Sequence, residues 1–518
     1  MSFLSKMKSA IAVSAITRLT VVAAMLPSLV GGTTAVTYPA PFSSAKAAVV
    51  RAAREAFVGQ TWSFDEVFGE EEMVASIKKQ GMTLSAETTV SEIPLDTLGL
   101  QGKKLSDIRL NLTAHMTPKK ESGAVLDATV KNTTLLSGNI YMNEEQLQLL
   151  VPKLSSTVLT VKHNEEQSEN KIAHSYAAGY FGLSTEQITR FLKYLPKHAE
   201  PVSVGEVQKN FWDIFKKAYN KYLSGAEFYN AGEETLNYER EARDCNIFAV
   251  EYESARAGLF LQEALSDSKG YVKEISDSFQ STESEVEDAF SNAEALVHKL
   301  KSNLRGTVVV KFFVYEKRLI RVTADWKIKP ETAGESAVPG SLVIDFAVKG
   351  SPTENMSITL STPVHYETTV TEIPKRLDMT VQSVTEYSAP EYYTRVLVDC
   401  NGAPYGITLD YKRRSGDVIL ELVNNRETDI LTGRINALNK GVSVDVTLKE
   451  YTHLDGSYTE EHPVNVSVSL KAVSGTVTPL AGSQKDILAM TEKDCKALEK
   501  EITKNVTKLL FSMIGLLQ

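Results

Sequence analysis

The stretch GTVVVKFFVYEKRLIRVTADWKI, residues 306–328, decides the fold class. Its apolar side chains occupy every second position on both sides of Glu316-Lys317, first from Val308 to Val314 and then from Ile320 to Ile328. This period of two is typical of a strand with one buried face, because successive side chains point to opposite faces of a sheet. Two such runs joined by two residues predict an antiparallel hairpin.

The same alternation continues to about Lys471. Residues 342–348 and 356–360 form a second pair, and later pairs turn at residues 401–402, 415–416 and 455–456. Short links between alternating strands predict a meander, in which neighbours in sequence pair in antiparallel fashion. Each strand has one apolar face, so helices must cover the sheet.

Two other regions complete the expected architecture. Residues 108–116 alternate in the same way, and residues 139–142 and 147–151 flank a polar tip, which predicts another hairpin. Residues 170–305 are predicted to be mainly helical, with a short strand at 246–252, and a last helix is predicted from Thr491. The sequence therefore predicts an α+β fold, a long antiparallel meander sheet packed on helices, with a helical insertion in the middle of the chain.

The N-terminal segment is typical of an export signal. Lys6, Lys8 and Arg18 are its only charges before Lys46, an apolar run covers residues 19–30, and small residues follow to Ala47. A positive start, a short apolar run and small residues indicate a secretory signal peptide. The run is shorter than the ~20 residues of a spanning helix, but an uncleaved N-terminal anchor stays an alternative. We therefore expect residues 1–47 to be a signal peptide or N-terminal anchor, and an extracytoplasmic protein, secreted or associated with the cell envelope.

The composition excludes some classes of function. The 518 residues include 56 Lys and Arg against 65 Asp and Glu, a formal net charge of −9, and 42% of the residues are hydrophobic. An acidic balance argues against unspecific nucleic-acid binding, which needs a basic surface, so we expect no nucleic acid among the partners. The sequence contains neither a phosphate-binding glycine loop nor an H-E-x-x-H or G-x-S-x-G motif. We therefore predict that the chain is not an enzyme and has no cofactor.

The cysteines predict no framework of disulfides. Cys245, Cys400 and Cys495 are odd in number and too far apart for the usual spacing of zinc ligands. Burial as structural thiols is the expectation for all three.

One aromatic stripe is the candidate ligand-binding site. Phe211, Phe215, Tyr219 and Tyr222 are spaced four, four and three residues apart and so share one face of a predicted helix. They would line a hydrophobic cavity for a ligand, or they would form part of the core. Both interpretations stay open at this level.

Three further features have two interpretations each. His453 with Glu460, Glu461 and His462 would converge on a metal ion across one hairpin, or lie on a solvated turn; no metal is predicted. The tip at residues 412–414 would touch an anionic polymer or lipid head group, or discourage aggregation of a sheet edge. The segment ETTVSEIP at 87–94 reappears as ETTVTEIP at 367–374, as related half-units or by coincidence.

Four segments carry a resemblance to known proteins: GNIYMNEEQLQLLVP at 138–152, YFGLSTEQ at 180–187, the strand pairs at 306–328 and 342–360, and DILAMTEKD at 486–494. Their order resembles that of uncharacterised secreted proteins of Gram-positive anaerobes and of the LolA/LppX-like superfamily of lipoproteins and lipid carriers. This resemblance covers most of residues 48–518 and implies a half-open barrel that wraps helices around an apolar cavity. The chain has no lipobox cysteine, which is a departure from the lipoprotein members. Residues 48–518 would form one such half-barrel region, or two lobes, 48–240 and 241–518.

Three functions follow as expectations. The first is an exported non-catalytic binding protein of the cell envelope that holds a lipid or other apolar small molecule. The second is a structural or sensory module that binds an envelope protein partner and no ligand. An envelope hydrolase is the least favoured, because it needs carboxylates or a histidine gathered in one cleft.

Overall fold

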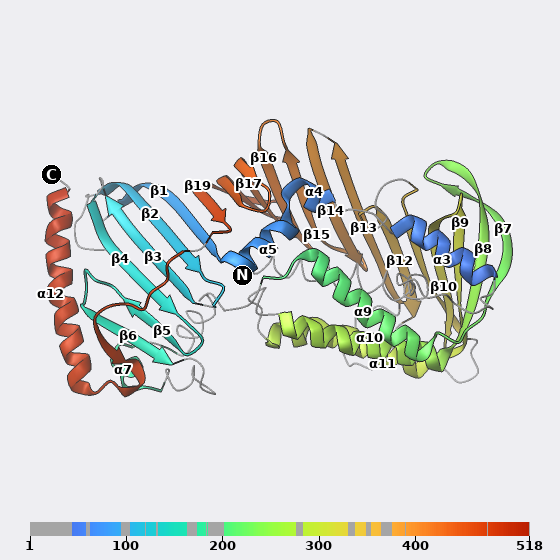
Figure 1. Ribbon diagram of the computed structural model, residues 1–518, viewed down its shortest axis with the longest axis horizontal. Helices are drawn as coiled ribbons and strands as arrows, with labels where there is room; N and C mark the ends of the chain where they lie inside the picture. The colour runs from blue at the N-terminus through green and yellow to red at the C-terminus, as the bar shows by residue number, and fades with distance from the viewer. Residues whose placement is uncertain are drawn as a thin grey trace. The chain divides into compact units, whose positions relative to one another are not determined.

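The structure is a computed structural model of the chain (Figure 1). Its described residues are 44–57, 63–94, 104–119, 121–130, 133–162, 174–182, 184, 201–275, 283–329, 337–348, 354–363, 376–388, 390–473 and 475–516. Residues 1–43 of the expected signal or anchor lie outside them, as does the second copy of the repeated octapeptide. Within the described residues, no helix combines the length and the hydropathy that a membrane span requires.

The chain divides into two compact units, each built from separated segments. Unit 1 comprises residues 1–67, 203–432 and 451–461, and unit 2 comprises residues 68–202, 433–450 and 462–518. The division considered from the sequence falls at residue 240, whereas unit 1 contains residues on both sides of that position. Three strands, β17 (Glu427–Asn439), β18 (Ser443–Asp455) and β19 (Tyr458–Lys471), give part of their length to each unit.

Unit 1 is an antiparallel meander with helices. Its strands follow one another in pairing from β7 to β16. They are β7 (Phe228–Tyr238), β8 (Glu241–Glu253), β9 (Leu304–Tyr315), β10 (Arg318–Ile328), β11 (Val338–Phe346), β12 (Met356–Pro363), β13 (Arg376–Ser388), β14 (Glu391–Cys400), β15 (Ala403–Lys412) and β16 (Asp417–Asn424). Its helices are α3 (Ser44–Phe57), α4 (Ser63–Phe68), α9 (Val204–Tyr222), α10 (Ser254–Ile275) and α11 (Glu283–Asn303).

The core of unit 1 lies on one face of this meander. The register places one row of apolar side chains directly opposite one another across five strands, and each is at most 1% exposed. The row is Phe312, Val322, Ile344, Ile358 and Val381. Helix α3 contacts β10, and α10 contacts both β9 and α9. The alternation read from residues 306–328 therefore marks the face that the helices of unit 1 bury.

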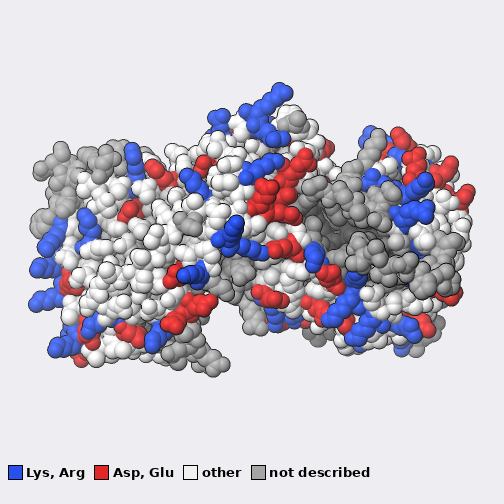
Figure 2. Space-filling view, in the orientation of Figure 1, with Lys and Arg blue, Asp and Glu red and all other residues white. Residues whose placement is uncertain are grey.

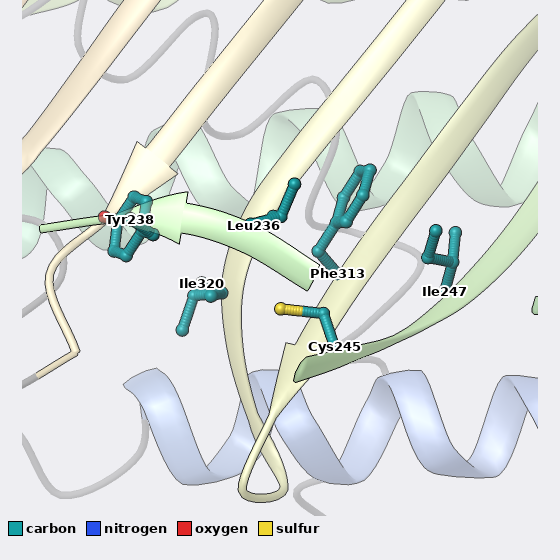
Figure 3. Close-up of a cluster of buried hydrophobic side chains, with 6 residues drawn as sticks. All are labelled: Leu236, Tyr238, Cys245, Ile247, Phe313 and Ile320. Carbon is teal, nitrogen blue, oxygen red and sulfur yellow. The ribbon is translucent and has the colours of Figure 1, made fainter. Parts of the chain in front are cut away.

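A second cluster of unit 1 joins the β7–β8 hairpin to the strands beside it. Figure 3 shows its six side chains, Leu236, Tyr238, Cys245, Ile247, Phe313 and Ile320. The hydroxyl of Tyr238 donates a hydrogen bond to the carbonyl oxygen of Phe346, at the end of β11. The tip of the hairpin is therefore attached to a strand more than a hundred residues away in the sequence.

Unit 2 is a smaller antiparallel sheet. Its pairing order is β19, β1, β2, β3, β4, β5, β6 and β20, and only the last pair is parallel. The strands are β1 (Met82–Pro94), β2 (Lys104–Met116), β3 (Ser122–Val130), β4 (Thr133–Met142), β5 (Gln146–Leu150), β6 (Thr157–Lys162) and β20 (Ser483–Asp486). Its helices are α5 (Glu70–Gln80), α7 (Tyr176–Tyr180), the 3-10 turn η3 (Ile487–Ala489) and α12 (Glu492–Leu516).

The α+β fold with a long antiparallel sheet and helices is confirmed in this coarser form. None of the described strand pairings closes a sheet into a ring, so a barrel is not supported. The helical insertion over residues 170–305 is not confirmed either, because β7 and β8 lie between α9 and α10. The sequence of β7 does not alternate clearly, and the β7–β8 turn at Glu239-Arg240 has positive φ angles of 51° and 65° without a glycine or asparagine. The turn at Glu316-Lys317 has the same geometry and its hairpin was predicted, so it is the weak alternation of β7 that hid the β7–β8 hairpin.

Candidate functional site

The predicted aromatic stripe packs between two helices of unit 1. Phe211 and Phe215 are each 1% exposed; their rings lie 5.4 Å from the ring of Tyr271 and 6.4 Å from that of Phe260, both on α10. Burial raises the pKa of Tyr219. The position of the stripe is thus explained by contact between α9 and α10.

Tyr222, the last residue of the stripe, lies at the rim of this contact. Its hydroxyl donates a hydrogen bond to Glu263 over 2.6 Å, and the same carboxylate pairs with Lys221. The two donors hold the pKa of Glu263 below its usual value. Tyr222 therefore joins α9 to α10 through its polar end.

Unit 2 presents a sheet face of a different kind, here named the apolar face. Three rows of uncharged residues cross it on β19, β1, β2, β3 and β4. The rows are Leu470–Leu84–Ala114–Ala124–Ile140, Val468–Ala86–Leu112–Leu126–Gly138 and Val466–Thr88–Leu110–Ala128–Leu136. Leu110 and Leu136 are each 36% exposed and Leu126 is 53% exposed. Large apolar side chains directly opposite one another thus stay in contact with solvent.

Two helices cover one end of this sheet. Met73 and Ile77 of α5 pack with Met82 and Met116, in the row beyond Leu84 and Ala114. At the far side of the same row, Met142 packs with Leu147, Val161 and Ala178 of α7. The three rows of the apolar face begin directly beside this covered row.

The opposite face of the same strands is polar. Ser85, Asn111, Thr113 and Ser467 lie there around a shallow groove of about 340 Å³. The strands of unit 2 are therefore sorted into one polar face and one apolar face, both with access to solvent. Such sorting is expected of an antiparallel sheet, but the apolar side is normally buried.

A second groove belongs to unit 1 and has a volume of about 1060 Å³. One wall is α4, through Ser63 and Glu66, and another is the β7–β8 tip, through residues 237–239. The ends of β11 and β12 and the strand β13 supply the rest, including Asp345, residues 354–357 and residues 382–385. Four stretches that are distant in the sequence thus meet at the groove. The spacing of residues within any one stretch therefore does not predict it.

The carboxylates of this groove have partners within the protein. Asp345 accepts two hydrogen bonds from Arg321, at 2.5 and 3.1 Å, and this pair raises the pKa of the guanidinium. Glu354 is 5% exposed and accepts hydrogen bonds from the backbone N–H and the hydroxyl of Ser63, at 2.7 and 2.5 Å. Paired and hydrogen-bonded acids are the form in which a protein tolerates buried carboxylates.

The remaining two carboxylates of the groove are held in the same way. Glu66 accepts a hydrogen bond from the hydroxyl of Tyr387 over 3.3 Å. Glu239 accepts one from the backbone N–H of Val348 over 3.1 Å and lies 3.4 Å from Arg243. All four acids therefore act as fixed hydrogen-bond acceptors along the groove.

The histidine of the candidate metal hairpin has another partner. Nδ1 of His453 lies 2.7 Å from Oδ1 of Asp429, and the hydroxyl of Tyr451 donates to the same oxygen over 2.7 Å. Burial and this carboxylate raise the pKa of Tyr451 to about 12. Among the residues that the structure describes, no group of three His, Cys, Asp or Glu side chains is arranged to hold a metal ion.

The other sequence candidates are placed as follows. Lys and Arg side chains gather where β15 turns into β16, the tip at residues 412–414 (Figure 2). Cys245 and Cys495 are buried and Cys400 is half-buried, and burial raises the pKa of all three thiols. Raised pKa values disfavour the reactive thiolate, so the expected structural role is confirmed for the two buried cysteines.

The apolar face was accessible to sequence reasoning only in part. The alternation of residues 108–116 and 126–130 indicates which side chains share a face, but it contains no signal that this face stays exposed. Comparison with known proteins supplies no assignment for either unit. No protein-family model and no curated protein matches the chain.

Proposed function

We propose that this chain is an exported, non-catalytic binding protein of the cell envelope whose apolar face in unit 2 holds a lipid or another apolar ligand. One observation carries the proposal: Leu110, Leu126 and Leu136 are 36–53% exposed in the middle of an uncharged sheet face. Contiguous exposed apolar surface is typical of an interaction site, because burial of each Å² is worth about 25 cal/mol.

The uneven surface of the apolar face favours a flexible chain as its ligand. Small residues, among them Ala128 and Gly138, alternate with Leu112, Leu126 and Leu136 along and across the strands. Side chains of unequal size leave shallow hollows, and methylene groups can fill them without polar partners. The N-terminal pattern supports export, and the resemblance to the LolA/LppX-like superfamily agrees with a lipid as the ligand.

The test begins with the full chain, produced with its own N-terminal segment in an exporting Gram-positive host. Native mass spectrometry followed by organic extraction would detect a bound lipid at one equivalent. The variant Leu126→Gln is expected to lose it, because an amide on the apolar face opposes burial of an acyl chain.

The matched control is Val125→Gln. Val125 precedes Leu126 on β3, points to the opposite face and is itself 38% exposed. This variant should keep the lipid. A lipid-free wild-type chain, under conditions that keep a known lipid carrier loaded, would contradict the proposal, and so would equal loss from both variants.

A second candidate function is a structural or sensory module that binds an envelope protein. The open character of the face favours it, because its leucines lie on a sheet surface in contact with solvent. This function predicts a lipid-free chain that forms a cross-linked complex in the envelope. Leu126→Gln would abolish the complex and Val125→Gln would keep it.

A further inference from the structure

The groove of unit 1 contains three polar side chains with hydrogen-bonding groups to spare, Asn237, Ser357 and Gln382. Asn237 and Gln382 are exposed and Ser357 is half-buried. Within the part of the chain that the structure describes, none of the three side chains makes a hydrogen bond. Amides both donate and accept, and a hydroxyl does the same, so together they offer both halves of a hydrogen bond.

Two of these groups, Ser357 and Gln382, form a row with a fixed hydrogen-bond acceptor, the carboxylate of Asp345. Ser357 on β12 is directly opposite Asp345 on β11 and Gln382 on β13. Directly opposite residues have their Cβ atoms about 4.5–5.5 Å apart, which is close to the spacing of groups on a small polar ligand. The bidentate contact with Arg321 fixes the carboxylate of Asp345 at the end of the row.

The lining of the groove excludes two ligand classes. No lysine or arginine is among the described lining residues, whereas four carboxylates are, so an anionic ligand would be repelled. Among the lining residues that the structure describes, the aliphatic ones are Ala347, Met356 and Val384, too few to bury an acyl chain.

The protein itself compensates part of this negative charge, which weakens the attraction for a cationic ligand. Arg321 already compensates the charge of Asp345, and Arg243 lies beside Glu239. Glu66 accepts a hydrogen bond from the hydroxyl of Tyr387, and Glu354 accepts one from the backbone N–H of Ser63. The acids are thus arranged as oriented acceptors, and the neutral partner of an oriented carboxylate is a hydroxyl group.

The groove also has about the size of a small-molecule site and an aromatic ring at its rim. The volume of about 1060 Å³ lies just above the usual range for small-molecule sites, about 300–1,000 Å³. Tyr387 at the rim is 40% exposed and has an apolar ring, against which the C–H face of a sugar can lie. From the lining, its free amides and its volume, we infer that this groove binds a neutral oligosaccharide.

The inference concerns unit 1 and is independent of the lipid proposed for unit 2. The probes are three neutral tetrasaccharides, tetra-N-acetylchitotetraose, cellotetraose and maltotetraose, together with the cationic tetramer of glucosamine. Saturation-transfer NMR and calorimetry on the full chain would measure binding. At least one neutral tetrasaccharide is expected to bind saturably, and more tightly than the glucosamine tetramer.

Variants then assign the binding to the groove. Gln382→Ala and Asn237→Ala each remove one hydrogen-bonding side chain and should weaken the affinity about five- to tenfold. Both residues are exposed, so neither substitution threatens the fold. The control is Thr380→Ala, because Thr380 is exposed on the same strand and the same face but does not line the groove; it should bind as the wild type does.

Three results would overturn the inference. They are no binding of any neutral tetrasaccharide at about 10 mM, a weak affinity by any standard, preferential binding of the glucosamine tetramer, and unchanged affinity in both Gln382→Ala and Asn237→Ala. None of them bears on the lipid content of unit 2.

Discussion

The two units contain sheets of the same kind that are covered very differently. In unit 1 the row through Val322, Ile344 and Ile358 is at most 1% exposed, whereas Leu126 in unit 2 is 53% exposed. Both rows arise from the same alternation of apolar and polar residues. Alternation therefore identifies the side chains that share a face, but it does not determine whether the chain itself buries that face.

The difference has a physical origin in the helices. In unit 1, α3 and α10 contact the strands that bear the buried row. In unit 2, α5 and α7 pack at the row formed by Met82, Met116 and Met142. A fully buried aliphatic side chain stabilises a fold by about 1.5–3 kcal/mol relative to an exposed one, so the two sheets should respond unequally to truncation.

The largest expected effect is therefore a difference between two truncations. Ile344→Ala should lower the free energy of unfolding of unit 1 by about 2–5 kcal/mol, because it leaves a cavity in a packed core. Leu126→Ala, in protein freed of any bound lipid, should cost less than about 1 kcal/mol, because Leu126 is half in solvent already.

The chain supplies a separate probe for unit 1. Of its three tryptophans, Trp212 on α9 and Trp326 on β10 belong to unit 1. Tryptophan fluorescence during unfolding in urea thus follows unit 1, and hydrogen exchange of peptides from β2 and β3 follows unit 2. Equal costs for the two truncations would show that the apolar face is packed as tightly as the core of unit 1.

How far the sequence reached can be judged from particular residues. The alternation around Glu316-Lys317 predicted β9 and β10. Tyr238 could not be placed, because its strand does not alternate clearly and its hydroxyl bonds to the distant Phe346. Local patterns encode strands and helices, whereas contacts between distant segments depend on packing.

The same limit applies to the candidate sites. The spacing of Phe211 and Phe215 correctly indicated one helix face, but it did not indicate α10 as the partner of that face. Ser63 and Glu354 meet in the groove of unit 1 although 291 residues separate them. No periodicity reports such a meeting, so the groove appears only once the chain is folded.

A medium effect on the free energy of unfolding is expected from removing the hydrogen-bond partner of a histidine, which is a carboxylate in unit 1 and a hydroxyl in unit 2. In unit 1 the carboxylate of Asp429, 2% exposed, contacts both His453 and Tyr451. In unit 2 the hydroxyl of Thr83 lies 2.8 Å from Nδ1 of His115. Asp429→Ala should cost about 2–3 kcal/mol and Thr83→Ala about 1 kcal/mol, because hydrogen bonds to a charged group are stronger than those between neutral groups.

These two costs are measured with the same pair of probes. Tryptophan fluorescence in urea reports Asp429→Ala, and hydrogen exchange of β1 and β2 reports Thr83→Ala. Asp429→Asn should lie between the wild type and Asp429→Ala, because the amide keeps one acceptor. If Asp429→Ala lowers the free energy of unfolding by no more than Thr83→Ala does, the charge of the partner does not determine the strength of these contacts.

The smallest expected effect is a pH dependence within unit 2. Glu501 of α12 accepts hydrogen bonds from the backbone N–H of Ser156 at 2.8 Å and from the hydroxyls of Ser155 and Ser156. The backbone N–H is the main cause that holds the pKa of Glu501 below its usual value, and the two hydroxyls act in the same direction. Glu354 of unit 1 is held by Ser63 in a similar way but is more deeply buried.

A depressed pKa in the folded state fixes the sign of this effect. The unfolded chain takes up a proton on this residue near its ordinary pKa of about 4.3, before the folded chain does. The stability that Glu501 contributes is therefore complete above that pH and is lost as the pH falls through the lower pKa of the folded state. After correction for the intrinsic exchange rate at each pH, hydrogen exchange in α12 should accelerate on acidification from about pH 5 to pH 3, relative to other helices.

The variant Glu501→Gln separates this group from its neighbours. Asp494 in the same helix also has a lowered pKa, through Lys485 and Thr491, so some pH dependence should remain in any variant. The amide that replaces the carboxylate does not titrate, so the variant should exchange faster than the wild type at pH 7 and show a smaller acceleration at pH 3. An equal acceleration in both proteins would mean that α12 is attached to β6 by its apolar contacts alone, and the carboxylate–serine contact would then differ from its counterpart in unit 1.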